Sequence, residues 1–99
     1  MEIRIQSIHF DADAKLLDFT KKKIQKLQTF YDHIIDADVY LKLENNSAQV
    51  KDKIADISVN IPGSSLHGSD TAKSFEEAID AAVEAVTRQL QKHKEKAKI

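Results

Sequence analysis

The sequence predicts one α+β domain, a two-layer sandwich in which a four-stranded mixed sheet carries two helices on one face. Three segments alternate apolar and polar residues as half-buried strands do, and a fourth short segment follows a turn signal. Two longer segments repeat apolar residues with the 3.6-residue period of a helix. With 99 residues the chain is long enough for one core and too short for two. The expected order is β-α-β-β-β-α.

The first strand and the first helix are separated by a change of period near residue 10. Isoleucines alternate with polar residues over 2–8, which predicts a strand. Asp11 or Asp13 is expected to cap the helix that follows, roughly 13–31, because a short acceptor side chain satisfies free N–H groups at a helix start. The apolar stripe of this helix comprises Leu16, Leu17, Thr20, Ile24, Leu27 and Tyr31.

The next three strands follow a return to the two-residue period. Apolar residues alternate over 35–43 and over 55–61, and the turn-forming residues 45–47 predict that the two strands form an antiparallel hairpin. Pro62-Gly63 marks another tight turn, after which 66–69 predicts a short fourth strand of unassigned register. If the first two strands are neighbours, the helix between them requires parallel pairing, and the remainder is an antiparallel meander.

The second helix is predicted to start near Ser74, because Ser74 and Glu77 have the spacing of a capping box. Helical potential continues to about Lys94. We expect residues 1–95 to form the single domain and residues 96–99 to form a basic tail. The apolar stripe of this helix comprises Phe75, Ala78, Ile79, Ala82, Val83, Val86 and Leu90.

The charges are unevenly distributed along the chain, although the net charge is only −1. Residues 15–29 hold five lysines against one aspartate, and residues 85–99 hold five basic residues against one glutamate. Residues 30–84 carry eleven acidic groups and four basic ones. The near-neutral total therefore hides two basic segments, one on each predicted helix.

Helical projection places these cations in rows beside the apolar stripes, with acids on the opposite flank of the second helix. Two parallel rows about a helix diameter apart would meet phosphates across a groove of duplex RNA. Lysines at a helix C-terminus and acids at its N-terminus also complement the helix dipole, so the pattern has a purely structural explanation as well. The first row is Lys15, Lys22 and Lys26 with Lys23 nearer the stripe, the second is Arg88, Lys92 and Lys96, and the acids are Glu76, Asp80 and Glu84.

The sequence contains no recognisable catalytic or metal-binding motif. The four histidines are scattered without an i, i+4 pair, and two glycines cannot form a glycine-rich phosphate loop. We therefore expect no enzymatic activity, no cofactor, no metal and no small-molecule substrate. The absence of cysteine, of an export signal and of a membrane-length apolar run favours a cytoplasmic protein without a membrane partner, and the free protein is expected to be a monomer.

Several strings, in order along the chain, resemble the ribosome hibernation promoting factor family, also called ribosome-associated inhibitors or sigma-factor modulation proteins. They are KKIQKL at 22–27, FYDHII at 30–35, DVYL at 38–41, IPG at 61–63 with LH at 66–67, FEEAID at 75–80 and RQLQKHK at 88–94. None is a catalytic signature, but together they span almost the whole chain.

This resemblance implies a fold similar to double-stranded-RNA-binding domains and docking into the small ribosomal subunit, on its rRNA, where messenger and transfer RNA bind. Occupancy of that channel would store the ribosome inactive. The basic positions of the family correspond to Lys23, Lys26, Arg88 and Lys92. Thr29 and Ala85 stand where relatives often carry a basic residue, so the phosphate contacts are expected to shift to Lys22 and Lys96. The long family members have an additional dimerisation domain, and the resemblance leads us to expect a short member without one.

Two other function classes fit a chain of this size. A small acylphosphatase-like hydrolase would need a phosphate cradle with a positioned arginine and asparagine, and neither strand-to-helix loop offers one. A protein-interaction module would use the polar sheet face or a free strand edge.

Overall fold

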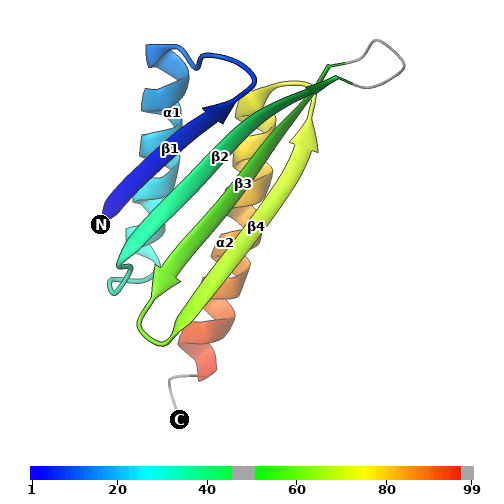
Figure 1. The fold of residues 1–99 in the computed structure, drawn as a ribbon. Helices are drawn as coiled ribbons and strands as arrows, with labels where there is room; N and C mark the ends of the chain where they lie inside the picture. Colours follow the sequence, from blue (N-terminus) through cyan, green and yellow to red (C-terminus); the bar gives the residue numbers. More distant parts are fainter. Residues whose placement is uncertain (46–50, 97–99) are drawn as a thin grey trace.

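The two helices cover one face of a four-stranded sheet, and the other face is open (Figure 1). The computed structural model describes residues 1–45 and 51–96. The predicted fold class and element order are confirmed. The elements are β1 (Glu2–Ile8), α1 (Ala14–Gln25), the 3₁₀ helix η1 (Lys26–Thr29), β2 (Asp36–Asn45), β3 (Lys51–Ile61), β4 (Ser64–Ala72) and α2 (Phe75–Lys96).

The strands lie in sequence order, with one parallel pair at the edge of the sheet. β1 pairs in parallel with β2, so that Ile5 lies opposite Val39, while β2, β3 and β4 form an antiparallel meander. A parallel pair needs a crossover, and α1 supplies it. Figure 1 shows that α1 and α2 lie behind the sheet and run in the same direction, so their C-terminal ends lie at the same end of the domain.

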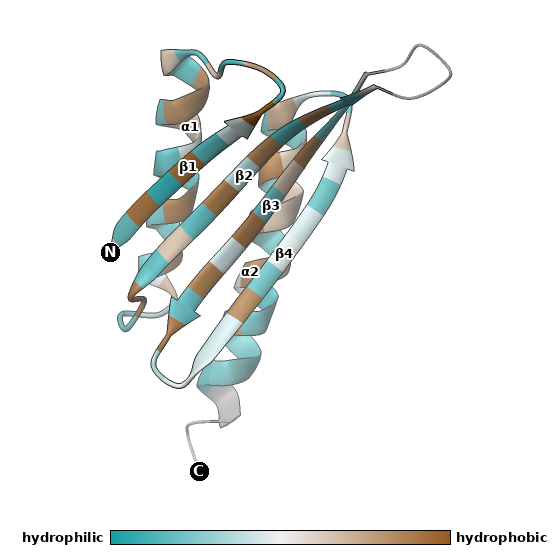
Figure 2. Cartoon of the chain, in the orientation of Figure 1, coloured by the Kyte–Doolittle hydropathy of each residue, from teal (hydrophilic) through white to brown (hydrophobic). Residues whose placement is uncertain are grey.

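The core lies between the sheet and the helices, and it is built from the alternate strand positions that the sequence predicted. Hydrophobic and hydrophilic residues alternate along β2 and β3 in Figure 2. Each fully buried leucine or isoleucine contributes about 1.5–3 kcal/mol relative to an exposed one. The buried hydrophobic residues are Leu16, Ile24, Leu27, Ile34, Ala37, Val39, Leu41, Ala55, Ile57, Val59, Ile61, Ala78, Ile79, Ala82, Val86 and Leu90.

The helix starts agree with the predicted caps. Asp13 is the N-cap of α1, and its carboxylate accepts a hydrogen bond from the backbone N–H of Leu16 at 2.8 Å. The Ser74 hydroxyl accepts one from the backbone N–H of Glu77 at 3.2 Å, and α2 begins at the next residue. Both side chains satisfy N–H groups that a helix start leaves free.

The predicted extent of the first helix is wrong, because the α-helix ends at Gln25 rather than near residue 31. The chain tightens into η1, where the Thr29 hydroxyl donates to the carbonyl of Lys26 at 2.6 Å. The backbone N–H groups of Phe30 and Tyr31 then both donate to the carbonyl of Leu27, at 3.0 and 3.1 Å. These bonds close the helix and start the turn toward β2.

Two strand predictions also need correction. β4 has nine residues instead of four, because Gly68 and Asp70 occupy the same face as Leu66 and hide the apolar/polar alternation. Ile35 was expected to face the core with Ala37, but it precedes β2 and is 56% exposed. Of the predicted turn at 45–47, Asn45 ends β2, and the other two residues lie outside the described residues.

Gly68 allows β4 and α2 to approach each other closely. A Cβ atom at this position would lie 2.5 Å from the backbone oxygen of Ala82 and 2.9 Å from Cγ2 of Val86. The backbone oxygen belongs to a regular helix and cannot move aside as a flexible side chain could. Glycine is therefore required here by the spacing of the two layers.

We predict that Gly68→Ala lowers the free energy of unfolding by about 1–3 kcal/mol, because the added methyl group forces β4 and α2 apart. Urea unfolding followed by circular dichroism measures this. Ser69→Ala, at the neighbouring exposed position, is the control and should stay within about 0.5 kcal/mol of the parent. Equal stability of Gly68→Ala and the parent would contradict the close packing.

Candidate nucleic-acid interface

Lys23 lies in the seam between the two helices. Its Nζ is 2.9 Å from a carboxylate oxygen of Asp80 on α2, and 5.5 Å from the ring centroid of Phe19. Its side chain is 33% exposed. Of the basic residues that the sequence singled out, Lys23 is therefore the one that joins α1 to α2, and its charge is already partly neutralised by the neighbouring helix.

Two further candidates form ion pairs within their own helices. Lys22 pairs with Asp18 at 3.0 Å, and Arg88 pairs with Glu84 at 2.8 Å. All four side chains are more than 60% exposed, and exposed pairs of this kind contribute only about 0.2–1 kcal/mol. A phosphate group can therefore replace the carboxylate at small cost.

Lys26 and Lys92 are exposed, and neither has an ion pair among residues 1–45 and 51–96. Both lie in the C-terminal parts of their helices, Lys26 as the first residue of η1 and Lys92 one turn before the end of α2. Lys96 is the last residue of α2, and its side chain lies outside the described part of the structure. Two cations without ion pairs among the described residues thus lie where the helices end.

The expected arrangement of acids and bases on opposite flanks of α2 is wrong for Glu84 and Arg88, which contact each other one turn apart. The acids and bases share a four-residue spacing, and each such step turns only about 40° around the helix. They therefore form one slowly turning stripe, acidic in its first half and basic in its second. The acidic half meets α1 through Asp80.

The basic half of that stripe turns away from α1. Gln89, next to Arg88, is fixed to the edge strand β4, where its amide donates to the carbonyl of His67 at 2.5 Å and accepts from the backbone N–H of His67 at 3.3 Å. The two rows of cations consequently diverge along the helices instead of facing each other. Among the side chains that the structure describes, the cations nearest the C-terminal end of the helix layer are Lys26 on η1 and Lys92 and Lys94 on α2.

A small cavity of about 190 Å³ lies at that end and was not predicted from the sequence. We call it the terminal cavity; Thr29, Phe30, Tyr31, Asp32, His33 and Lys94 line it. The Tyr31 ring meets the rings of His33 and His93 edge to face, each with centroids 5.6 Å apart. These residues are far apart in the sequence. Only the parallel direction of the two helices, which brings residues 30–33 and 93–94 together, could have predicted the cavity.

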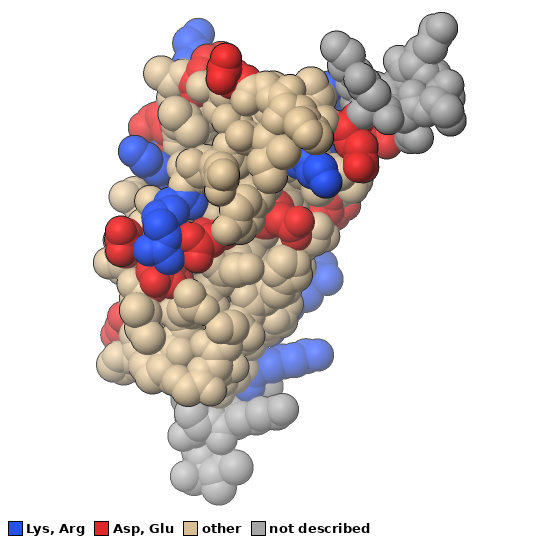
Figure 3. Space-filling view, viewed as in Figure 1, with Lys and Arg blue, Asp and Glu red and all other residues tan. Residues whose placement is uncertain are grey.

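The open face of the sheet, which the helices do not cover, carries mainly negative charge. Among the described residues, its charged side chains include only two bases, Arg4 and Lys42. Figure 3 shows this open face, with a basic group among acidic ones over β1 and β2. A surface of this sign repels phosphate. The acids at its alternate strand positions are Glu2, Asp36, Asp38, Glu44, Asp52 and Asp56.

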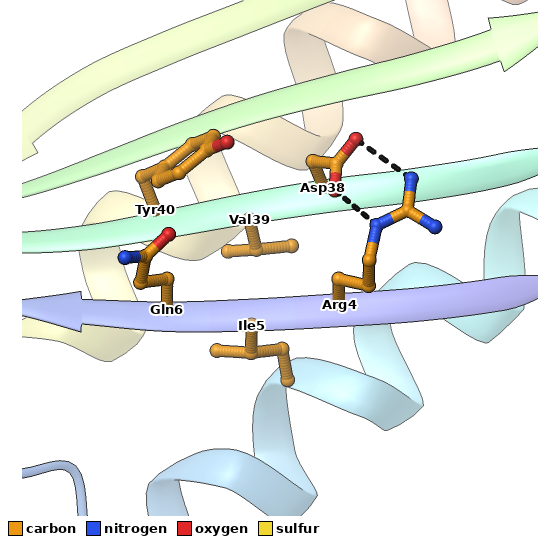
Figure 4. A pocket seen from close by; sticks show the side chains of 6 residues that line it. All are labelled: Arg4, Ile5, Gln6, Asp38, Val39 and Tyr40. Carbon is orange, nitrogen blue, oxygen red and sulfur yellow. Dashed lines mark hydrogen bonds and ion pairs between the residues drawn. The ribbon is translucent and has the colours of Figure 1, made fainter.

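Arg4 organises that face across the parallel strand pair. Its guanidinium binds the carboxylate of Asp38 through two nitrogens, at 2.6 and 3.1 Å (Figure 4), and lies 3.1 Å from carboxylate oxygens of Asp36 and Glu2. A cavity of about 370 Å³ beside this cluster also includes Tyr40 and Gln6. Because Arg4 is held by three carboxylates, it is unavailable to phosphate.

The same cluster holds the pKa of Asp36 below its ordinary value. The amide of Asn60 donates to its carboxylate at 2.6 Å, and this bond is the largest cause, followed by the hydrogen bond from Arg4. The pKa of Arg4 is raised by Asp38 and Asp36 in turn. Both groups are therefore charged throughout the neutral range.

We predict that Asn60→Ala reduces the amount by which the free energy of unfolding falls as the pH is lowered. A carboxyl group with a depressed folded-state pKa contributes stability above its ordinary pKa of about 3.9, and this is lost as the pH falls through the folded-state value. The parent should therefore lose stability steadily below about pH 4, and the variant should lose less over that range. Urea midpoints between pH 2 and 7 measure this; Ser58→Ala is the control, and an unchanged acid slope in Asn60→Ala would refute the assignment.

Two negative findings concern the described residues only. They contain no group of three or more histidine, aspartate or glutamate side chains that could hold a metal ion. No helix within 1–45 and 51–96 is long and apolar enough to cross a membrane.

Comparison with known proteins identifies relatives over nearly the whole chain. Residues 3–98 match the family described as sigma 54 modulation protein / S30EA ribosomal protein. A ribosome hibernation promoting factor of Klebsiella oxytoca is 31% identical over 98 residues, which cover 99% of this chain and 98% of that protein. The protein of the same name from Escherichia coli K12 is 29% identical over the same shares of the two chains.

Solved structures share the fold. A ribosomal subunit interface protein from Coxiella burnetii superimposes with a TM-score of 0.85 at 23% identity, covering 96% of this chain and 99% of that one. The N-terminal domain of Thermus thermophilus Protein Y gives 0.83 at 24% identity, covering 94% and 99%. At these identities the likeness concerns the arrangement of sheet and helices.

Proposed function

The chain belongs to the sigma 54 modulation protein / S30EA ribosomal protein family, and we propose that it is a ribosome hibernation factor of the cytoplasm. In this proposal it binds the small ribosomal subunit near the channel for messenger and transfer RNA and stores the ribosome inactive. The contact with rRNA is made by the C-terminal halves of α1 and α2, with Lys22, Lys23, Lys26, Arg88, Lys92 and Lys96 as the phosphate-binding residues. Relatives named ribosome hibernation promoting factor, matched over nearly their full length, support this role.

The observation that carries the proposal is the separation of charge between the two layers. Exposed lysines without ion pairs among the described residues include Lys26, Lys92 and Lys94 at the C-terminal end of the helix layer, whereas the open sheet face is acidic. A molecule with this distribution is oriented by the field of a polyanion, helices inward and sheet outward. The near-neutral total charge does not oppose binding, because six of the sixteen acidic residues lie on the open sheet face, away from the helices.

The ion pairs of the helix layer make its cations exchangeable. Lys22, Lys23 and Arg88 each contact a carboxylate that is at least half exposed, so a phosphate can take its place. Arg88 can then grip a phosphate through two nitrogens, which is stronger and more directional than a lysine contact. Binding of this kind weakens steeply as salt rises, because counterions compete for the same phosphates.

We predict that Arg88→Glu combined with Lys92→Glu abolishes cosedimentation with purified small subunits at low salt, because two phosphate contacts become repulsive. The expected loss of affinity is about 10-fold or more for each reversed contact. Circular dichroism should show an unchanged fold, since both side chains are exposed.

The matched control is Lys21→Glu combined with Lys42→Glu, which makes the same change of charge. Lys21 lies about 160° around α1 from Lys23, which contacts α2, and Lys42 lies on the open sheet face. This variant should bind small subunits nearly as the parent does. Equal binding by the Arg88 and Lys92 variant, or equal loss in the control, would move the RNA contact to another surface.

We also predict that Asp80→Asn tightens binding about 2- to 5-fold at low salt, because it releases Lys23 from its carboxylate partner and removes a negative charge beside the RNA. Titration of fluorescently labelled protein with small subunits measures the dissociation constant. The gain should vanish in Asp80→Asn combined with Lys23→Gln. An Asp80→Asn variant that binds no tighter would exclude Lys23 from the contact.

A further inference from the structure

We infer that the terminal cavity receives one unstacked base of the bound RNA, and that Phe30 is the platform on which this base stacks. The inference rests on the proposed function, because it names the kind of RNA element that the end of the helix layer recognises. Proteins commonly read structured RNA at loops and bulges, where bases are free to stack on aromatic side chains.

The size of the terminal cavity suits a single planar group. Its volume is about 190 Å³, whereas pockets for drug-sized ligands and cofactors occupy about 300–1,000 Å³. Its lining combines ring side chains with a few polar groups, as sites for small planar ligands do. A whole nucleotide cofactor would not fit, but one base entering from the surface would.

Phe30 is the ring that the protein leaves uncovered. The other phenylalanines are used internally, since Phe10 stacks on Phe75 with centroids 4.5 Å apart and Phe19 lies beneath the ammonium group of Lys23. Tyr31 is flanked by two histidine rings. Phe30 is 40% exposed, and no aromatic or cationic partner covers it in the described part of the chain.

The backbone holds this ring in place before any ligand arrives. The N–H of Phe30 donates to the carbonyl of Leu27 at 3.0 Å, and Leu27 is fully buried in the core. Tyr31, the next residue, packs against the core as well. An exposed aromatic ring on a fixed backbone loses little conformational freedom when a base stacks on it, which favours binding.

The polar groups around the cavity distinguish a base from a phosphate. The C-terminal ends of η1 and α2 lie at this cavity, and the helix dipole gives each of them a partial negative charge. Together with the carboxylate of Asp32, this charge disfavours an anion inside the cavity. A neutral base is not repelled, and an amino group on its edge can donate to the Asp32 carboxylate. Lys94, which also lines the cavity, can contact the phosphate group of the next nucleotide. The preferred base therefore carries an amino group, as adenine, cytosine and guanine do and uracil does not.

The test combines affinity with chemical probing of small-subunit rRNA bound to the full chain. Phe30→Leu, which keeps the apolar bulk and loses the aromatic face, should bind small subunits about 10-fold more weakly, and Phe30→Tyr should bind as the parent does. Tyr40→Ala is the control, because Tyr40 is equally exposed, at 40%, but lies on the open sheet face. Circular dichroism checks the fold of each variant.

Dimethyl sulfate and kethoxal report accessible edges of adenine, cytosine and guanine, and a carbodiimide reports uracil. The parent should protect one unpaired adenine, cytosine or guanine, and Phe30→Leu should lose this protection while backbone protections elsewhere persist. If Phe30→Leu matches the parent in affinity and protections, or if the protected base is a uracil, the inference is wrong although the proposed function stands. If the parent fails to bind small subunits at all, the proposed function fails first.

Discussion

The parallel pairing of β1 with β2 is the constraint on which the rest of the structure depends. A parallel neighbour requires a crossover, so α1 must return along one face of the sheet, and the meander that follows brings α2 back along the same face in the same direction. Two parallel helices place their C-terminal ends together. The basic residues near the end of each helix, which are remote in sequence, are thereby brought to the same end of the domain as the terminal cavity.

The two-residue period of the strands separates the charges. Each strand gives most of its apolar side chains to the core and its polar ones to the open face, and in β1 to β3 six of those polar side chains are acidic and two are basic. Arg4 ties three of the acids together across the parallel pair, which reduces their mutual repulsion. The alternation that buries the apolar side chains therefore also places acidic side chains on the open face, opposite the helix layer. Gly68 then sets how closely α2 approaches, and hence where its basic end lies.

Local patterns in the sequence predicted most of the fold. Asp13 and Ser74 marked the helix starts, and the apolar stripes predicted the buried faces, because caps and periodicity depend on neighbours within about four residues. The end of α1 at Gln25 depends on hydrogen bonds to Leu27 and Lys26 that no pattern announces. The sequence showed which residues are basic, but it did not show which carboxylates they pair with. That Lys23 meets Asp80, and that Tyr31 meets His93, follows only from packing between distant segments.

In the proposed complex the C-terminal end of the helix layer faces RNA, while the acidic sheet faces away. A cryo-electron microscopy structure of the chain bound to the small ribosomal subunit tests this most directly. We expect rRNA phosphates against the C-terminal halves of α1 and α2, with Arg4 and its carboxylates on the side remote from the RNA. A complex in which the open sheet face lies against rRNA, with the helix ends in solvent, would contradict it.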